Sequence, residues 1–436
     1  MKLVVSDRDA ADGQQLDVTD SGPAYHPRLA DTSVSELMDD FPAVLIAGAR
    51  ATGKTTTAAQ RVAQVDRLDE PGVAAAYRAD PDAALRRSAR PVLLDEWQEV
   101  PEVLAAVKRV VDRDQTPGQF LLTGRVRAEL TNELWAGTGR IVRTEIFGLT
   151  ERELSGQLDS AHPPFLSVLA RGAINELTVP SSPPDIDDYL QRAVRGGFPE
   201  IAYRQRSERA RGLWLASYLD DLVTRDAAAL DTHKDPAKLR RYLQALALNT
   251  AGMPTDATVY QAAGVNVKTA SSYEQLLQNL YVLTLVPAWS TNRLSRLTKA
   301  AKRYLVHPGL AAAAAQVRLA DVLADPDLTG RYFDAFAAAQ LRPEVALMYP
   351  RPTSYHLRVE GGRREVDLVF DMGAGRVVAL EFKAGAAPSI DDAKHLLWLR
   401  DELGADFLAG AVIHTGPGLF DLDDRVYAIP LCTMWS

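Results

Sequence analysis

The residues between Gly48 and Thr55 have the types and spacing needed to hold phosphate groups. The segment Gly48-Ala-Arg-Ala-Thr-Gly53-Lys54-Thr55 matches the pattern G-x-x-x-x-G-K-[ST] at every fixed position. Backbone N–H groups of such a loop turn inward around the phosphates, the lysine reaches the β- and γ-phosphates, and the hydroxyl binds Mg²⁺. The sequence therefore predicts a site for a nucleoside triphosphate, expected to be ATP, with Mg²⁺. The residues assigned to this site are Gly48, Ala49, Arg50, Ala51, Thr52, Gly53, Lys54, Thr55 and Thr56.

The elements that flank this loop support the prediction. The apolar run Ala43 to Ala47 indicates a buried strand, and the helix-forming stretch Thr56 to Val65 follows the loop. The N-terminus of that helix adds partial positive charge at the phosphates. Strand, glycine loop and helix in this order distinguish a phosphate loop from a chance match; a glycine turn before an ordinary helix is the alternative.

A second motif lies about forty residues further on and supplies two carboxylates. Pro91-Val-Leu-Leu-Asp95-Glu96 is an apolar strand that ends in acidic residues, as in a Walker B motif. We expect Asp95 to hold the Mg²⁺ shell and Glu96 to orient or deprotonate the attacking water. An acidic turn after a strand is common, so this motif gains its meaning from the phosphate loop.

A third strand ends in Leu121-Leu122-Thr123-Gly124-Arg125, which places a hydroxyl and a guanidinium where a γ-phosphate sensor belongs. Arg140 and Arg143 are further candidates for neutralising charge in the transition state. The alternative for each arginine is solvation or pairing with a nearby carboxylate, because surface ion pairs are common.

Strands and helices alternate through this region, which predicts an α/β domain with a parallel sheet and its ligand at the carboxyl ends of the strands. The candidate strands are Val44–Ala47, Val92–Leu94, Phe120–Thr123 and Ile141–Glu145. The candidate helices are Thr55–Val65, Ala74–Tyr77, Asp82–Ser88, Val100–Arg113 and Ala128–Leu134, preceded by Ser33–Met38 with Thr32 or Ser33 as its cap.

The middle of the chain is predicted to be helical. Apolar residues at helical spacing in the stretch Glu208 to Asp226 indicate a core-facing helix. Thr258–Ala263, a turn, and Lys268–Asn279 have the proportions of a helix-turn-helix, and the β-like pieces Val282–Pro287 and Arg303–Val306 follow. This arrangement predicts a winged helix that either contacts DNA or packs against the nucleotide domain or a partner. The candidate DNA contacts are Lys268, Ser271, Arg293, Arg296, Lys299 and Lys302.

The C-terminal part contains charged residues on a predicted hairpin, Arg364–Phe370 and Val377–Lys383. Asp367 lies on the first strand, and Glu381 and Lys383, two residues apart, share one face of the second. This arrangement is similar to the PD-(D/E)xK nuclease core, in which carboxylates hold Mg²⁺ and the lysine positions water. Asp334, on the preceding predicted helix, stands where a further acid completes that site. The alternative is an inactive scaffold whose charges form an ion-pair cluster.

Three other residues have plainer interpretations. His395 and His414 are more typical of an ordinary helix surface and strand end than of a phosphate site, and Cys432 is expected to be buried in a terminal strand, Pro430 to Trp435. A single cysteine excludes an intrachain disulfide and fits a reducing cytosol.

Together these motifs resemble a prokaryotic family of AAA-superfamily ATPases with a C-terminal domain of unknown function. The matching segments are LDEWQEVPEV, FLLTGR, a Gly-Arg before GLTERE, Arg195–Glu200, Ser217–Asp226, Glu365–Asp367 and Glu381–Lys383. The resemblance runs from about Tyr25 to Trp435. It assigns nucleotide roles to Gly48, Gly53, Lys54, Thr55, Asp95 and Glu96. Many members have serines where Arg125 and Val126 stand, and a glutamate where Asp334 stands.

Composition and the motifs suggest four segments: a polar tail (1–24), an ATPase domain with a helical extension (25–232), a winged-helix domain (236–312) and a nuclease-like α/β domain (313–436). No apolar run approaches the ~20 residues of a membrane helix, and no signal-peptide core is present, so a cytoplasmic protein is expected. The net charge of −8 argues against a wholly basic nucleic-acid coat but permits a local basic patch.

Three functions follow from this organisation. The first is an ATPase whose Mg-ATP cycle repositions the winged helix and the nuclease-like domain, on DNA. The second is an ATP-dependent regulatory or antitoxin-like binding protein without cleavage activity. The third is a metal-dependent nuclease gated by ATP, with Asp334, Asp367 and Glu381 as metal ligands and Lys383 beside them. Because arginine fingers are often supplied in trans, a homo-oligomer is compatible with all three.

Overall fold

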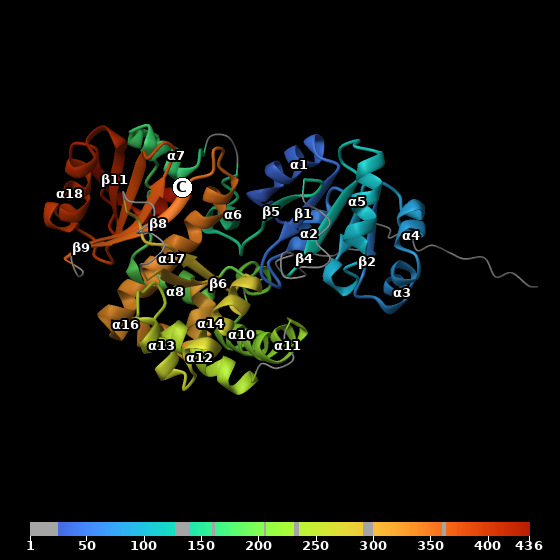
Figure 1. Ribbon diagram of the computed structural model, residues 1–436. Coiled ribbons are helices and arrows are strands. Elements are labelled where there is room, and N and C mark those ends of the chain that lie inside the picture. The colour runs from blue at the N-terminus through green and yellow to red at the C-terminus, as the bar shows by residue number, and fades with distance from the viewer. Residues whose placement is uncertain are drawn as a thin grey trace, which may run out of the picture.

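The computed structural model shows an α/β region, a helical region and a second α/β region (Figure 1). It describes residues 25–126, 139–158, 162–204, 206–230, 235–290, 300–359 and 363–436. Several predictions lie outside these residues: the polar tail, the helix Ala128–Leu134 and the side chains of Arg293, Arg296 and Lys299. The division into four segments stays a prediction.

The first α/β region is built on a five-stranded sheet in the order β2-β3-β4-β1-β5, and every pairing in it is parallel. The strands are β1 (Ala43–Ala47), β2 (Gln64–Arg67), β3 (Val92–Asp95), β4 (Phe120–Gly124) and β5 (Val142–Glu145). The predicted parallel sheet is confirmed, and the phosphate loop lies directly after β1. The central strands β1, β3 and β4 are completely buried, as both faces of a parallel sheet require.

Helices cover both faces of this sheet (Figure 1). One face packs against α1 (Ala30–Asp40) and α2 (Lys54–Ala59). The other packs against α3 (Pro71–Ala79), α4 (Pro81–Arg87) and α5 (Val103–Arg113), with the short 3₁₀ helix Trp97–Glu99 ahead of α5.

Two local predictions in this region are wrong. The helix after the phosphate loop ends at Ala59, not Val65, because the chain returns to the sheet as β2. The cap of α1 is Leu29, and neither Thr32 nor Ser33 fills that role.

A run of short helices leads out of the first sheet. They are α6 (Glu151–Ser155), α7 (Phe165–Ala170), the 3₁₀ helix Ile174–Glu176, α8 (Ile186–Arg195), α9 (Pro199–Ala202), α10 (Glu208–Asp221) and α11 (Ala227–Leu230). The predicted helix Glu208 to Asp226 is present, but its last turn, Leu222–Asp226, is a π-helix. Its apolar residues Leu215, Tyr218, Leu219 and Leu222 are buried in the core of the middle region.

That middle region consists of α12 (Pro236–Leu248), α13 (Asp256–Ala262), α14 (Val267–Asn279), the antiparallel pair β6 (Leu283–Val286) and β7 (Lys302–Leu305), α15 (Pro308–Ala315) and α16 (Leu319–Ala324). The two helices and the two strands appear where the sequence predicted them. Assignment of this arrangement as a winged helix stays a prediction.

The C-terminal region is a six-stranded mixed sheet in the order β12-β13-β11-β10-β9-β8. The long helix α17 (Pro326–Leu347) and α7 cover one face, and α18 (Lys394–Leu403) covers the other. Its strands are β8 (Thr353–Val359), β9 (Arg364–Asp371), β10 (Val377–Phe382), β11 (Phe407–His414), β12 (Phe420–Asp423) and β13 (Val426–Pro430). The predicted hairpin is β9–β10; the nuclease-like assignment of this sheet is not tested by its topology.

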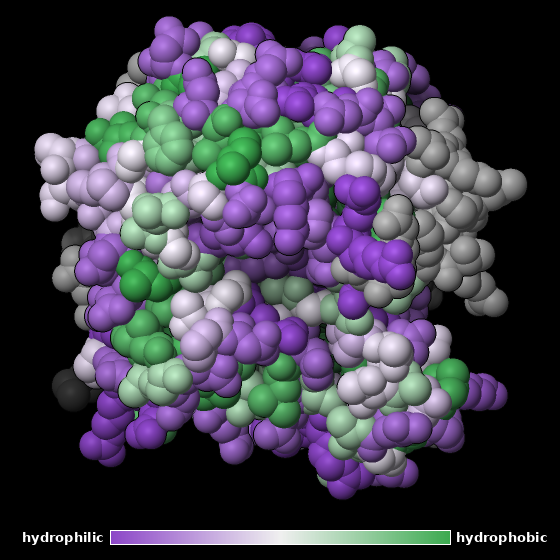
Figure 2. Space-filling view, turned by 90° about the vertical axis from the view of Figure 1, so that its left-hand side faces the viewer, coloured by the Kyte–Doolittle hydropathy of each residue, from purple (hydrophilic) through white to green (hydrophobic). Residues whose placement is uncertain are grey.

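The chain ends differently from the prediction. Leu431–Met434 form a 3₁₀ helix after β13, so the predicted terminal strand is wrong, whereas Cys432 is buried as expected. Seen from the side where α16 and α18 lie, the surface is mainly hydrophilic, with smaller hydrophobic patches and a central hollow (Figure 2). No helix among the described residues is long and apolar enough to cross a membrane.

Buried polar contacts join the first and last regions. Arg152 of α6 donates to Glu344 of α17 at 2.5 Å, and the other Glu344 oxygen accepts from the backbone N of Phe165 at 2.9 Å. The backbone N of Glu151 donates to the Gln340 side chain at 2.7 Å. Burial raises the pKa of the Glu344 carboxyl, and the Arg152 guanidinium opposes that shift. These contacts fix α6, at the end of the nucleotide sheet, to the C-terminal region.

Candidate nucleotide-binding site

Backbone geometry makes two of the loop glycines necessary. Gly48 has φ +149°, and a Cβ there would lie 2.2 Å from the carbonyl oxygen of Ile146. Gly53 has φ +95° at the residue before α2, a left-handed conformation that costs other residues energy. The loop therefore passes close to the end of β5 and then turns sharply into the helix.

Lys54, Thr55 and Asp95 meet at the carboxyl edge of the sheet. The Lys54 ammonium is buried and donates to the carbonyl oxygen of Ala49 at 2.9 Å, across its own loop. The Thr55 hydroxyl donates to Asp95 Oδ1 at 2.8 Å, and the Thr123 hydroxyl donates to the same oxygen. A hydroxyl beside a carboxylate is a donor set that Mg²⁺ accepts, so these residues fit the ion. The structure thus brings together residues from three separate segments: the phosphate loop, the end of β3 and the end of β4.

The pKa of Lys54 is lower than that of an ordinary lysine. Burial lowers its pKa to about 8, against the opposing effect of the Glu96 and Asp95 carboxylates. Desolvation penalises the charged ammonium, and a nearby anion would restore it. The phosphates of a nucleotide are such an anion.

Glu96 and Arg125 lie next to each other at the mouth of the site. Glu96 has φ +56°, a strained backbone conformation of the kind found at functional sites, and its carboxylate accepts from Gln98. Arg125 is 3.9 Å from Glu96 and 3.0 Å from Glu99, so in this structure it pairs with carboxylates, the alternative recognised from the sequence. Gly124 is needed before it, because a Cβ there would lie 2.2 Å from the Trp97 indole nitrogen.

Asp226 connects this site to the π-helix after α10. Its carboxylate is buried and lies 3.2 Å from Arg50 of the phosphate loop and 3.9 Å from Arg125. Asp221 adds a third contact, 3.5 Å from Arg50. The segment Ser217 to Asp226, whose role could not be derived from its sequence, thus lies against the phosphate loop.

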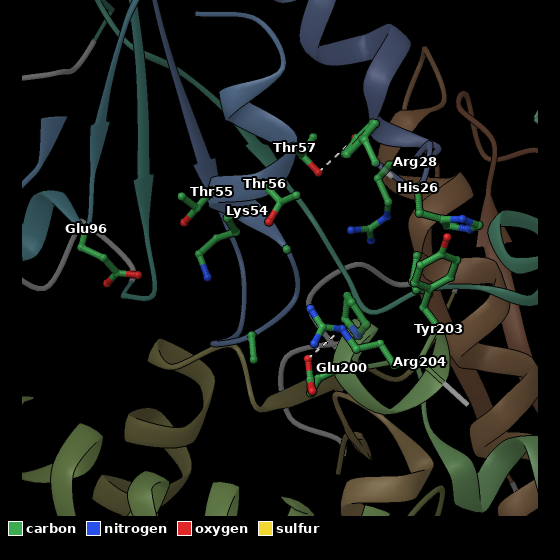
Figure 3. Close-up of a pocket in the computed structure, with 15 residues that line it drawn as sticks. His26, Arg28, Lys54, Thr55, Thr56, Thr57, Glu96, Glu200, Tyr203 and Arg204 are labelled. Carbon is green, nitrogen blue, oxygen red and sulfur yellow. Dashed lines mark hydrogen bonds and ion pairs between the residues drawn. The ribbon is translucent and has the colours of Figure 1, made fainter. Parts of the chain in front are cut away.

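A cavity of about 400 Å³ adjoins the loop and is formed mostly by residues that sequence reasoning missed (Figure 3). Its walls include Tyr25 and His26 from the segment before α1 and Tyr203 after α9. The His26 and Tyr203 rings lie 4.6 Å apart with 42° between their planes. Glu96 and Lys54 line the same cavity. Tyr25 and His26 are far from Tyr203 in the sequence and belong to no motif, so their place in this cavity could not be predicted from the sequence.

Arg28 is the other residue that was missed. Its guanidinium is buried and donates to Glu153 at 2.8 Å, to the Thr52 carbonyl at 2.9 Å and to the Phe147 carbonyl at 2.7 Å. These contacts hold the phosphate loop to the start of α6. The only sequence signal was an arginine before a helix, in a chain rich in arginine.

The two remaining candidate arginines lie elsewhere. Arg140 stands before β5, at the amino edge of the sheet and opposite the loop, and pairs with Asp112 at 2.7 Å. Arg143 lies within β5 and lines a different cavity, together with Arg351 and Tyr281. Arg140 thus lies at the edge of the sheet opposite its own phosphate loop, and its role in neutralising charge in the transition state stays a prediction.

In the C-terminal region two of the three predicted metal ligands, Asp334 and Asp367, contact a lysine. Lys302 Nζ lies 2.5 Å from Asp334 Oδ2 and 2.9 Å from Asp367 Oδ1, and Lys383 donates to Glu381 at 3.1 Å. Burial raises the pKa of Asp334 to about 7 and that of Glu381 to about 8. The prediction that Lys302 contacts DNA from a wing is wrong, since its side chain is only 1% exposed. His395 contacts the backbone carbonyl of Glu365, and His414 contacts that of Gly418. Both contacts are ordinary side-chain to backbone hydrogen bonds.

Comparison with known proteins agrees with the first region. Residues 40–155 match the model of an AAA domain, and residues 186–321 and 329–434 match two domains of unknown function (DUF8612 and DUF4143). The nucleotide region thus resembles an AAA-type P-loop ATPase domain, and the C-terminal region matches a domain of unknown function.

Similar whole chains exist in mycobacteria. The uncharacterized proteins Rv2008c of Mycobacterium tuberculosis and Mb2031c of Mycobacterium bovis are each 28% identical over 396 residues, which is 89% of this chain and 80% of theirs. The Walker-type ATPase PABY2304 of Pyrococcus abyssi is 14% identical, with a TM-score of 0.37 over 65% of this chain and 94% of its own. A TM-score of this size supports no conclusion about shared structure.

The depressed pKa of Lys54 predicts a pH-dependent affinity for nucleotide. The free protein loses the ammonium as the pH rises through about 8, whereas bound phosphates hold the proton to higher pH. Affinity for Mg-ATP is therefore expected to be level below pH 8 and to fall by up to about tenfold per pH unit above it. Calorimetry between pH 6.5 and 9.5, in buffers of different ionisation enthalpy, would also show proton uptake. Affinity that stays level to pH 9.5, or a Lys54→Met protein with the same slope, would contradict this assignment.

Proposed function

We propose that this chain is an ATP-binding AAA-type ATPase that hydrolyses Mg-ATP in the cytoplasm and uses the cycle to move its middle and C-terminal regions. The observation that carries the proposal is the convergence of Lys54, Thr55, Asp95 and Glu96 on one side of the parallel sheet, with a cavity beside them. Each of these residues has the chemistry that phosphoryl transfer requires.

The roles follow from the contacts of these residues. Lys54 neutralises the β- and γ-phosphates after leaving Ala49, while Thr55 ligates Mg²⁺ and Asp95 holds its shell. Glu96 is the base or orienting group for water, which separates hydrolysis from binding. Thr123 fixes Asp95, so its role is positioning.

The base of the nucleotide would lie in the cavity beside Tyr203. The rings of Tyr203 and His26 line this cavity next to each other. Figure 3 shows both on the side of Lys54 away from Glu96. His26 is held by a hydrogen bond of 2.7 Å between its Nε2 and the Glu153 carbonyl, so Arg28 and the base pocket share one anchor. Stacking on an aromatic ring suits a purine but does not select adenine over guanine.

Motion would begin at Asp226. Arg50 and Arg125 both lie beside this buried carboxylate, and both lie beside the phosphate loop or Glu96. If the γ-phosphate attracts Arg50 or Arg125, the ion pair of that arginine with Asp226 is weakened. Because an unpaired buried carboxylate is costly, the protein around Asp226 would then rearrange. The helix pair around Asp226, α10 and α11, would then shift.

Action on DNA is the more distant part of the proposal. Lys268 is exposed on α14, the second helix of the predicted helix-turn-helix, so its ammonium is free to approach a phosphate backbone. A homo-oligomer would supply an arginine finger from another subunit, since Arg140 faces away from its own site.

A second candidate function is an ATP-dependent regulatory or antitoxin-like protein whose nuclease-like domain does not cleave. The lysine buried among Asp334 and Asp367 favours this candidate over a metal-dependent nuclease.

Glu96→Gln is expected to bind Mg-ATP as tightly as the wild type and to hydrolyse it roughly 10² to 10⁴ times more slowly, because the amide cannot accept a proton. Phosphate release under single-turnover conditions and ATP affinity by calorimetry would measure the two effects. Glu99→Gln is the matched control, since Glu99 pairs with Arg125 at the same mouth but is farther along the turn. Wild-type turnover in Glu96→Gln would refute the base assignment.

Tyr203→Ala is expected to weaken ATP binding by about tenfold, the loss of one base–aromatic stack. Inorganic tripolyphosphate, which has no base, should bind the variant and the wild type equally. Titration of both ligands by calorimetry separates a base contact from damage to the loop. Equal losses for ATP and tripolyphosphate would place the base elsewhere.

DNA binding is expected to depend on Lys268. Lys268→Ala should weaken binding of a duplex and reduce the slope of log affinity against log salt by about one. Fluorescence anisotropy at several salt concentrations, with Lys394→Ala on α18 as an exposed control, would measure this. If the wild type binds no DNA at low salt and DNA leaves the rate of phosphate release unchanged, the regulatory candidate takes its place.

A further inference from the structure

The acidic cluster of the C-terminal sheet already contains a cation. Lys302, the first residue of β7, extends from the middle region so that its ammonium lies 2.5 Å from Asp334 of α17 and 2.9 Å from Asp367 of β9. The lysine side chain is 1% exposed, so the ammonium is shielded from water, whereas the Asp367 side chain is 19% exposed. The cation comes from outside the hairpin that carries the nuclease-like pattern.

The remaining oxygens of the two aspartates are also occupied. The Tyr304 hydroxyl donates to Asp334 Oδ1 at 2.8 Å, and the backbone N of Phe382 donates to Asp367 Oδ2 at 2.9 Å. Glu381 accepts from Lys383 through one oxygen, while its other oxygen has no partner among the described residues. Every aspartate oxygen that could bind a metal is therefore already hydrogen-bonded.

A divalent cation does not fit this arrangement. Mg²⁺ needs about six oxygen ligands at short range, and here an ammonium stands between the two aspartates. Within the part of the chain that the structure describes, no group of three or more His, Cys, Asp or Glu side chains is placed to hold a metal ion. The single unpaired oxygen of Glu381 does not supply a ligand set.

The next residue of β7, Arg303, contacts helices of the middle region. Arg303 donates to Asp256 of α13 at 2.6 Å and to Glu274 of α14 at 2.8 Å. Because side chains alternate along a strand, Lys302 and Arg303 point to opposite sides of the β6–β7 pair. One strand is thus bound to the C-terminal sheet on one side and to the helix pair on the other.

We propose that Lys302 is the resident cation of this cluster, and that the cluster is a junction between the middle and C-terminal regions instead of a metal-dependent nuclease site. The ammonium compensates the buried aspartates, which would otherwise carry a large desolvation cost. Lys302 and Arg303 together connect α13 and α14 to the C-terminal region through β7. None of these contacts involves the nucleotide site, so nucleotide-free protein is used to test them.

The first test asks whether the cluster binds a divalent cation. Wild-type full-length protein without nucleotide and an Asp367→Asn variant are titrated with Mn²⁺, and bound ion is followed by electron paramagnetic resonance. We expect the two proteins to bind equal, small amounts of Mn²⁺. One Mn²⁺ per chain in the wild type that is lost in Asp367→Asn, or DNA nicking with Mn²⁺ that the same substitution abolishes, would overturn the proposal.

The second test removes the charge and keeps the length of the side chain. Lys302→Met is expected to lower the melting temperature by roughly 5–15 °C, because two buried aspartates lose their counter-ion. Lys302→Met with Asp367→Asn should recover part of that loss, since one of the uncompensated charges is gone. Lys394→Met, on exposed α18, is the control and should melt like the wild type.

A Lys302→Met protein that melts within a degree of the wild type would show that the ammonium does not compensate the cluster, and the proposal would fail. If Lys302→Met does not fold at all, the Mn²⁺ titration of the wild type and Asp367→Asn still decides between a lysine-filled junction and a metal site.

Discussion

A buried charge without a partner is costly, and this chain meets that constraint by pairing buried charges from segments that are distant in sequence, two of them across boundaries between its regions. Removing an ion from water costs several kcal/mol even after the protein relaxes. Glu153 finds its partner in Arg28, more than a hundred residues earlier, and Glu344 of α17 finds its own in Arg152 of α6. Asp334 depends on Lys302 of β7. The first pair lies within the nucleotide region, whereas the other two form only when neighbouring regions pack together, so the stability of each region depends on its contacts with the next.

The nucleotide site is subject to the same constraint. The loop residue Arg50 and the sensor candidate Arg125 both face the buried carboxylate of Asp226, which belongs to the helical extension. Phosphates offer these guanidinium groups a second anionic partner. Binding and hydrolysis would therefore redistribute charge between the nucleotide and Asp226, which gives the proposed cycle a physical connection to the helices that follow.

Contiguous motifs were predictable from sequence and dispersed contacts were not. The phosphate loop and the Walker B strand are each defined by fewer than ten residues, so their spacing alone fixes which groups meet; the parallel sheet then followed from alternating strands and helices. The edge strand β2 is mostly polar, and its first two residues, Gln64 and Val65, fall within the helix that the sequence predicts. Arg28, Tyr203 and Asp226 reach the site only through the tertiary fold, and an arginine or tyrosine alone predicts no particular role.

The C-terminal cluster shows a different limit of pattern reasoning. A pattern of Asp, then Glu-x-Lys across a hairpin, describes where three side chains point, and the structure places Asp367 on β9, Glu381 on β10 and Lys383 one residue after β10. The pattern does not indicate which cation lies among these side chains, because that cation comes from a residue outside the hairpin. Lys302 precedes Asp334 by 32 positions and belongs to another region, yet it decides whether the aspartates face an ammonium or a metal. Carboxylates gathered on a sheet are compatible with both, since each cation satisfies the same oxygens. The function of such a cluster can therefore be assigned only when its cation is known, and here the cation is the ammonium group of Lys302.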